Sequence, residues 1–206
     1  TGVGTLNIED GSTVQVGRHF FFRNGYFDLD TTKITQIGGN LGIADTSADT
    51  TAVMTLTPGQ NLTTGTGIVI ATGTRSNGTF NQTGGTIDLG GASSIATGGT
   101  SQGVYNQIGG TVRIGGATGI GTGASAIGTY NQDGGTTTIV GTLTLGGAAN
   151  GVGVYNMTND AVFNGIALNI ATGNGVNTSA TFNQVGGTAT FTGVMTLGSG
   201  TGAGAS

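Results

Sequence analysis

The segment GTYNQDGGTTTIVGTLTLGG, residues 128–147, decides the fold of this chain. It combines an aromatic residue, an Asn-Gln pair, two consecutive glycines and a run in which apolar residues alternate with threonine, and it contains no His, Cys or Lys. Alternation of apolar and polar residues is typical of a strand with one buried face, and glycine pairs are typical of tight corners. The segment therefore predicts a structural unit of strand, corner and strand rather than a catalytic motif.

Variants of this segment recur along the chain at intervals of 25, 25, 25 and 27 residues. The aromatic slot holds Phe80, Tyr105, Tyr130, Tyr155 and Phe182, and each is followed by Asn81, Asn106, Asn131, Asn156 and Asn183. Weaker upstream copies place Ile34 and Leu56 in the aromatic slot, and a first copy is expected near Asn7. A fixed period of this length is the signature of a solenoid, so we predict about eight coils of about 25 residues in one domain, 1–206.

Apolar residues keep the same frame within each copy. One column lies nine residues after the slot and a second lies fifteen residues after it, for example Ile114 and Ile120, and no segment shows helical periodicity. These patterns predict an all-β fold, a single-stranded parallel β-solenoid (β-helix), and crossover chirality favours the right-handed form. Stacking of equal positions predicts an inward aromatic ladder and an asparagine ladder along the rod, with Asp88 and Arg113 paired in neighbouring coils.

Glycine pairs recur at one corner of the unit. A corner that requires positive φ accepts Gly most easily, and Asn or Asp at modest cost. Asn and Asp replace the pair in the copy that contains Tyr155, which keeps the corner geometry. The predicted corner residues are Gly38, Gly39, Gly84, Gly85, Gly109, Gly110, Gly134, Gly135, Asn159, Asp160, Gly186 and Gly187.

The composition narrows the function classes. The 206 residues include 45 Gly, one Pro and no Cys, with 7% charged residues and a net charge of −4. The chain lacks a basic patch for nucleic acid and an apolar run long enough to span a membrane. Since it begins at Thr1, we expect that a leader has been removed or the segment excised, and that the protein is extracellular or on the cell surface.

The unit G-x-Y-N-Q-x-G-G-T followed by L-x-L-G resembles repeats of bacterial surface and secreted proteins of the autotransporter-passenger and PEP-CTERM-associated kind. The resemblance covers about residues 34–198. It implies a right-handed parallel β-helix displayed outside the cell, in proteins that include adhesins and matrix proteins. It implies no catalytic residue.

Two segments depart from the repeat. Residues 18–30 are predicted as an aromatic-rich N-terminal insertion, a hairpin turned at Asn24-Gly25 that serves as a cap, a core plug or a subunit contact. Residues 198–206 are predicted as a short glycine-rich C-terminal tail. The candidate subunit contacts are Phe20, Phe21, Phe22, Tyr26 and Phe27.

Few residues suggest other chemistry. Asp28 and Asp30 can share a strand face near His19 and Arg23, but we favour a polar segment over a pair of catalytic carboxylates. Asp45 and Asp49 are better explained as a solvated loop than as a weak Ca²⁺ site. We therefore expect no enzyme activity, no metal and no cofactor.

Threonines share one column, as in ice-binding β-solenoids, although Ala161 interrupts that column. The adjoining column does not provide a flat threonine array. The first column contains Thr86, Thr111, Thr136 and Thr188, and the adjoining one contains Asp88, Arg113, Thr138, Phe163 and Thr190. Of the Asn-x-Ser/Thr sequons, Asn77 and Asn177 lie in variable turns and are the better candidates for glycosylation.

Two functions remain open from the sequence. The first is a structural subunit of an extracellular fibre or surface matrix, which assembles with copies of itself head to tail because its strand edges are open. The second is a rod-like adhesin or passenger stalk that binds glycans or a host surface through loops such as 18–30 or 44–66. An ice-binding or polysaccharide-cleaving β-helix is the weaker option.

Overall fold

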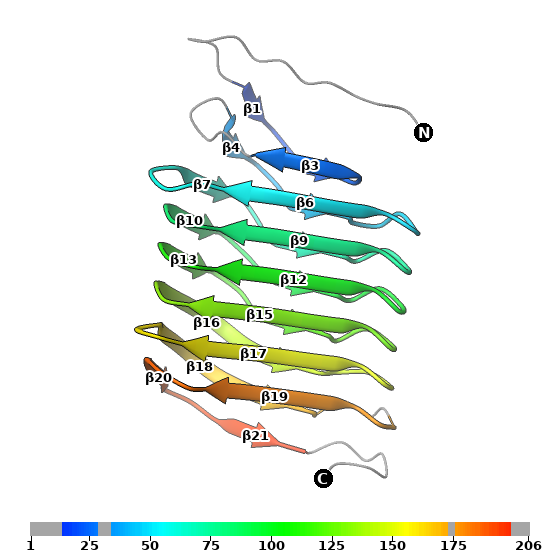
Figure 1. Cartoon of the computed structure of the whole chain (residues 1–206), viewed down its shortest axis with the longest axis vertical. Coiled ribbons are helices and arrows are strands. Elements are labelled where there is room, and N and C mark those ends of the chain that lie inside the picture. The colour runs from blue at the N-terminus through cyan, green and yellow to red at the C-terminus, as the bar shows by residue number, and fades with distance from the viewer. Residues whose placement is uncertain (1–13, 29–33, 173–175, 199–206) are drawn as a thin grey trace.

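The structure, a computed structural model, describes residues 14–28, 34–172 and 176–198. Within these ranges the chain forms 21 strands and no helix, and every strand pair is parallel. The strands stack as a rod, with successive coils lying below one another from β3 to β21 (Figure 1). The front strands in Figure 1 run to the left and the chain returns behind them as it descends, so the coil is right-handed. The predicted all-β parallel solenoid is confirmed.

One strand of each coil belongs to a seven-stranded sheet, sheet B. Its strands are β3 (Gly25–Asp28), β6 (Thr51–Leu56), β9 (Asn77–Gln82), β12 (Gln102–Gln107), β15 (Ile127–Asp133), β17 (Val152–Thr158) and β19 (Ser179–Gln184).

The other strands form the 14-stranded sheet A, in two rows. The first row contains β1 (Val14–Val16), β4 (Ile34–Ile37), β7 (Asn61–Thr64), β10 (Thr86–Leu89), β13 (Thr111–Ile114) and β20 (Thr188–Phe191). The second row contains β2 (Phe20–Phe22), β5 (Leu41–Ile43), β8 (Ile68–Ile70), β11 (Ser93–Ile95), β14 (Thr118–Ile120) and β21 (Met195–Leu197). The long strands β16 (Thr136–Leu145) and β18 (Val162–Ile170) run through both rows.

Strand register explains the core. In β12 the residues alternate between buried and partly or fully exposed, so Tyr105 and Gln107 point inward while Asn106 points outward. Each residue lies beside its equivalent in the next coil, as Tyr105 does beside Tyr130. The core is therefore a set of columns that run along the rod, in which equivalent residues of successive coils stack on one another.

The predicted phase is wrong in the first coils. Met54, not Leu56, lies beside Phe80, and Phe27 lies beside Met54. Ile34 belongs to β4 in sheet A rather than to the aromatic column. The described part of the chain thus contains seven sheet-B strands instead of the predicted eight, and the copy expected near Asn7 lies outside the described residues.

Residues 20–28 form regular coil strands, so the predicted insertion and hairpin are wrong. β2 pairs with β5 and β3 pairs with β6, both in the parallel sense, and the chain does not fold back at Asn24-Gly25. Aromatic residues replace the aliphatic residues of later coils in the same inward columns. The end of the predicted segment, 29–30, lies outside the described residues, as does most of the predicted tail.

The corners after β9, β12, β15 and β19 place the second glycine of the pair in the left-handed region. Gly85, Gly110, Gly135 and Gly187 have φ of 74°, 79°, 69° and 71°. A Cβ on Gly110 would overlap the carbonyl group of Gly85 in the preceding coil. Gly38 and Gly39 do not belong to this corner, because they lie between β4 and β5 of sheet A. An added Cβ on Gly38 would meet Gly17, and one on Gly65 would meet Gly38, so these glycines form another column.

Two further corners contain left-handed residues, most of them not glycine, and the sequence did not predict them. After the third strand of each coil the left-handed position is occupied by Ala44, Ala71, Ala96, Gly121, Gly146, Ala171 and Gly198. A few residues later it is occupied by Asp49, Arg75, Thr100, Ser125, Asn150 and Asn177. Positive φ is uncommon for residues with a Cβ, so coil stacking imposes these conformations.

Candidate functional site

The aromatic ladder lies in the core and is polar at its edge. The rings of Tyr105 and Tyr130 stack with centroids 4.5 Å apart, and those of Tyr130 and Tyr155 with centroids 4.7 Å apart. Phe80 and Phe182 continue the column at its two ends, each 5.1 Å from the neighbouring ring. Because the three tyrosines are buried, their hydroxyl groups need partners inside the core.

Buried glutamines provide these partners. The hydroxyl groups of Tyr105, Tyr130 and Tyr155 donate to Oε1 of a glutamine in the preceding coil, at 3.1, 3.0 and 2.8 Å. The accepting residues are Gln82, Gln107 and Gln132. Their exposed fractions are 0–1%, so these amides are core residues.

The same glutamines hold the glycine corners. Nε2 of Gln132 donates to the carbonyl oxygen of Gly135 at 3.1 Å and to that of Val162, in the next coil, at 2.9 Å. Gln107 makes the equivalent bonds to Gly110 and Thr136. Each glutamine thus binds the corner of its own coil and two groups of the next coil, the tyrosine hydroxyl group and a backbone carbonyl oxygen.

Whether an aromatic position holds tyrosine or phenylalanine depends on the residue at the glutamine position of the preceding coil. Tyrosine stacks after a coil that carries Gln82, Gln107 or Gln132. Phenylalanine stacks after a coil with an apolar residue in that place: Phe80 follows Leu56, and Phe182 follows Met157. A phenol over an apolar residue would lack an acceptor, and a glutamine under a phenylalanine would lack a donor.

The corner length changes with the same residue. Where the glutamine is replaced by Leu56 or Met157, the corner has one additional residue before the chain enters sheet A. In the copy with Tyr155 the left-handed residue is Asn159, at φ 53°. Asn159 and Asp160 therefore belong to a longer corner. The prediction that they replace the glycine pair one for one is wrong.

Burial also changes the ionisation of the tyrosine column. Desolvation raises the pKa of Tyr105, Tyr130 and Tyr155 above the usual tyrosine value of 10.0. A phenolate in this column would be buried among rings and apolar side chains, which favours the protonated form. The hydroxyl groups therefore act as donors throughout the physiological pH range.

The predicted asparagine ladder is confirmed on the outer face of sheet B. Nδ2 of each asparagine donates to Oδ1 of the asparagine in the preceding coil, at 2.8–2.9 Å. The donor of the last step is Asn183, whose side chain is exposed. All bonds run in one direction, so the ladder has a donor end towards the N-terminus and an acceptor end at Asn183.

The C-terminal face of the rod exposes the core columns. Met195 and Leu197 lie beside Leu168 and Ile170, and their exposed fractions are 51% and 69%. One coil earlier, Leu168 is fully buried in the same column. These side chains are exposed because no described coil lies beyond them.

The candidate subunit contacts near the N-terminus divide between two faces. Phe20, Phe22 and Phe27 point inward and form a cluster with centroids 5.4–5.7 Å apart. Phe21 and Tyr26 point outward, with exposed fractions of 39% and 87%. Strand alternation therefore gives three residues a core role and leaves two available at the surface.

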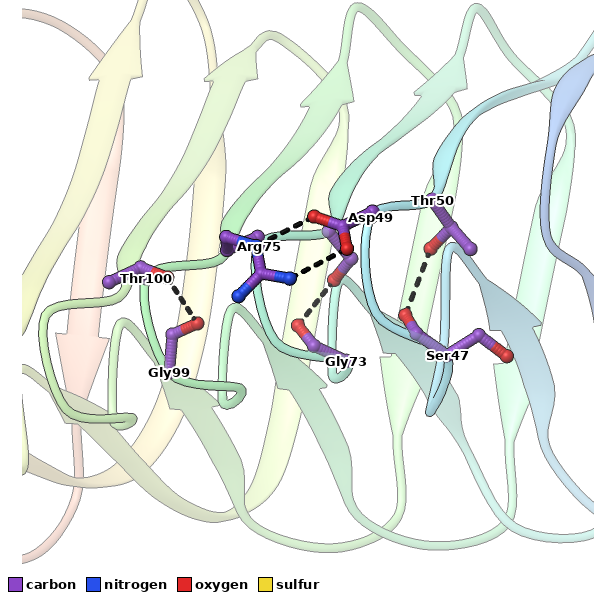
Figure 2. Close-up of polar contacts among 8 residues, drawn as sticks. Ser47, Asp49, Thr50, Gly73, Arg75, Gly99 and Thr100 are labelled. Carbon is purple, nitrogen blue, oxygen red and sulfur yellow. Dashed lines mark hydrogen bonds and ion pairs between the residues drawn. The ribbon is translucent and has the colours of Figure 1, made fainter.

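Carboxylate side chains face arginine residues. Asp88 and Arg113 lie side by side in the outer face of sheet A and pair at 3.0 Å, as predicted. Figure 2 shows the last corner of three successive coils, where Asp49 accepts two hydrogen bonds of 2.7 Å from Arg75. The hydrogen bond to Arg75 lowers the pKa of Asp49.

Asp45 is separate from Asp49 and is buried. Its Oδ1 lies 3.4 Å from Nε of Arg23 and accepts no hydrogen bond. Burial raises the pKa of Asp45, whereas the charge of Arg23 lowers it. Asp45 and Asp49 thus interact with different arginines.

The threonine face differs in one coil from the predicted alignment. The first column contains Val162 where Ala161 was expected, and the adjoining column contains Asn164 where Phe163 was expected. Phe163 is buried and contacts Tyr155. The additional corner residue after Met157 produces this shift by one position, and the face remains interrupted by Val162 and the Asp88–Arg113 pair.

The two glycosylation candidates lie on exposed turns or strand starts. Asn77 begins β9 and is exposed. Asn177 is also exposed, has φ 58°, and donates from Nδ2 to Asn150 at 3.2 Å. A glycan on Asn177 would therefore replace this contact.

Comparisons with family models, with curated proteins and with solved structures gave no match. Among the residues that the structure describes, no helix has the length and apolarity needed to cross a bilayer.

Proposed function

We propose that the chain is a structural rod of an extracellular fibre or surface matrix, and that the rod lengthens when a neighbouring molecule adds a parallel coil to its C-terminal face. The observation that carries this proposal is the exposure of Met195 and Leu197 in columns that are buried in earlier coils. An added coil would bury these side chains and pair the outer edges of β19 and β21, which have no strand partner among the described residues. The extracellular location rests on the repeat resemblance.

The simplest form of this assembly is head-to-tail addition of identical molecules. The first described coil offers Phe20, Phe22 and Phe27 as partly buried inward residues, which can pack against the apolar C-terminal face. Such a contact is heterologous and does not close, so it produces a filament.

Sedimentation velocity and negative-stain electron microscopy over a range of concentrations test this proposal. We expect concentration-dependent end-to-end association of the wild-type chain, and its loss in Leu197→Asp, which places a charge in the buried joint. Val185→Asp is the control, because Val185 is 83% exposed, directly follows β19 and is not one of the core-column residues. A wild-type chain that remains monomeric at every concentration would reject the proposal.

A depression on the outer face supports a second candidate, a glycan-binding adhesin stalk. It has a volume of about 400 Å³ and includes Asn131, Asp133, Asn156 and Thr158 in its lining. Amide, carboxylate and hydroxyl groups can bind sugar hydroxyl groups. Glycan-array binding that is lost in Asp133→Ala would favour this function, and the absence of binding to any glycan would remove it.

A further inference from the structure

The last coil ends in the glutamine type of corner. Nε2 of Gln184 donates to the carbonyl oxygen of Gly187 at 3.0 Å, as Gln82, Gln107 and Gln132 do to their own corner glycines. Gly187 has φ 71°, within the range of the equivalent glycines. Gln184 is therefore prepared in the same way as the glutamines that accept a tyrosine.

Two groups of this glutamine lack their usual inter-coil partners among the described residues. Oε1 of the earlier glutamines accepts a tyrosine hydroxyl group from the next coil, and their Nε2 also donates to a carbonyl oxygen of that coil. For Gln184 only the bond to Gly187 is present, and the side chain is exposed. A coil stacked on it would bury both groups.

The neighbouring asparagine adds a second requirement. Asn183 donates to Asn156, which leaves its Oδ1 at the open end of the ladder. Since each earlier Oδ1 accepts from the asparagine of the next coil, this position calls for a donor side chain.

We infer that the C-terminal face selects a coil of a partner β-solenoid that carries tyrosine over Phe182 followed by asparagine over Asn183. This inference rests on the proposed function, because it names the chemistry of the coil that lengthens the rod. In the described coils, a tyrosine stacks after each inward glutamine of sheet B that is followed by another coil. A phenylalanine stacks after Leu56 and Met157, the apolar residues at the same position.

The chain's own first described coil does not meet these requirements. Continuation of the sheet-B register would place Phe27 over Phe182 and Asp28 over Asn183. Phe27 has no hydroxyl group for Gln184, and the Asp28 side chain has no amide group to donate to Asn183. Self-association is therefore weaker than association with a matched coil.

The test uses the full chain and the double variant Phe27→Tyr/Asp28→Asn, which presents the matched pair at its own N-terminal edge. Sedimentation equilibrium measures the self-association constant, and circular dichroism and thermal melting check that each variant folds. Because a buried acceptor without a donor is costly, we expect the double variant to associate at least about 10-fold more tightly than wild type. Adding Gln184→Met, which removes the acceptor, is expected to abolish this gain.

The outcomes separate this inference from the proposed function. Equal association of wild type and the double variant, with loss in Leu197→Asp, would overturn the inference and leave coil addition intact. Retention of the gain in the Gln184→Met background would also overturn it, because the tyrosine would then act without the glutamine. No association in any variant would overturn both.

Discussion

The hydroxyl group of Tyr155 lies 2.8 Å from Oε1 of Gln132 in the preceding coil, and both residues are buried. The bond crosses between two coils and is the only hydrogen bond that Oε1 of Gln132 accepts among the described residues. Removal of the Tyr155 hydroxyl group therefore leaves the buried Oε1 of Gln132 without a donor.

A double-mutant cycle measures this interaction. Tyr155→Phe is expected to lower the free energy of unfolding by about 1–3 kcal/mol, because Gln132 then lacks a donor. Gln132→Met is expected to be more harmful, since the corner bonds to Gly135 and Val162 are also lost. The double variant should lose at least about 1 kcal/mol less than the sum of the single losses. Strict additivity in urea unfolding would contradict the pairing.

Alkaline pH is expected to destabilise the rod through the tyrosine column. Unfolded tyrosines ionise near pH 10.0, whereas the pKa of the buried ones is higher, so the folded state holds its protons more tightly. The free energy of unfolding is thus unaffected below pH 10 and falls above it, by up to about 1.4 kcal/mol per pH unit for each buried tyrosine.

Unfolding measured from pH 9 to 11.5 checks the source of this dependence. Tyr130→Phe should reduce the slope and still leave the Thr137 hydroxyl group as a donor to Gln107. Tyr26→Phe, at an exposed site, should leave the slope unchanged. Equal slopes for both variants would show that the buried column is not responsible.

Two adjacent glycines are expected to respond differently to alanine. Gly110 has φ 79°, and a Cβ there would overlap the backbone of Gly85, so Gly110→Ala should lower the free energy of unfolding by at least about 2 kcal/mol. Gly109 is not in the left-handed region, and its nearest neighbour would be 3.7 Å from the new Cβ. Gly109→Ala should therefore change stability by less than about 1 kcal/mol, and chemical denaturation of both variants tests the contrast. Similar losses would argue against the left-handed corner.

Thr100→Asn is expected to stabilise the chain. Thr100 is β-branched at φ 55°, and Asn150 occupies the equivalent corner position two coils later at the same φ. Asparagine tolerates this conformation better, so we expect a gain of about 0.5–1 kcal/mol in the free energy of unfolding. Thr79→Asn in the extended strand β9 is the control and should give no gain. A loss of stability in Thr100→Asn would contradict the prediction.

The repeat from Phe80 to Leu197 could be predicted because one residue pattern determines strand, corner and column together. The first coils could not be placed in phase, because Phe27 and Met54 lack the asparagine that follows the slot in the later copies, and one corner is longer. Residues 20–28 suggested an insertion since their aromatic density is unusual, yet their alternation fits the same columns.

Left-handed alanines such as Ala71 and Ala96 have no local sequence signal, since contacts between coils impose their conformation. The role of the buried glutamines was also missed, although a signal was present. The residue 23 positions before Tyr105, Tyr130 and Tyr155 is in each case the glutamine that accepts the tyrosine hydroxyl group. The pairs Leu56–Phe80 and Met157–Phe182 require the corner lengths as well, because their spacing is 24 or 25 residues.

The dependence of each aromatic residue on the coil before it restricts how such a gene can change in length. Duplication of the coil with Tyr130 places tyrosine after glutamine again and leaves every amide paired. Deletion of the coil with Tyr155 would instead bring Phe182 onto Gln132, with a buried acceptor left empty. Unequal recombination among the central coils therefore preserves the buried hydrogen bonds, whereas recombination that removes the coil with Tyr155 breaks one.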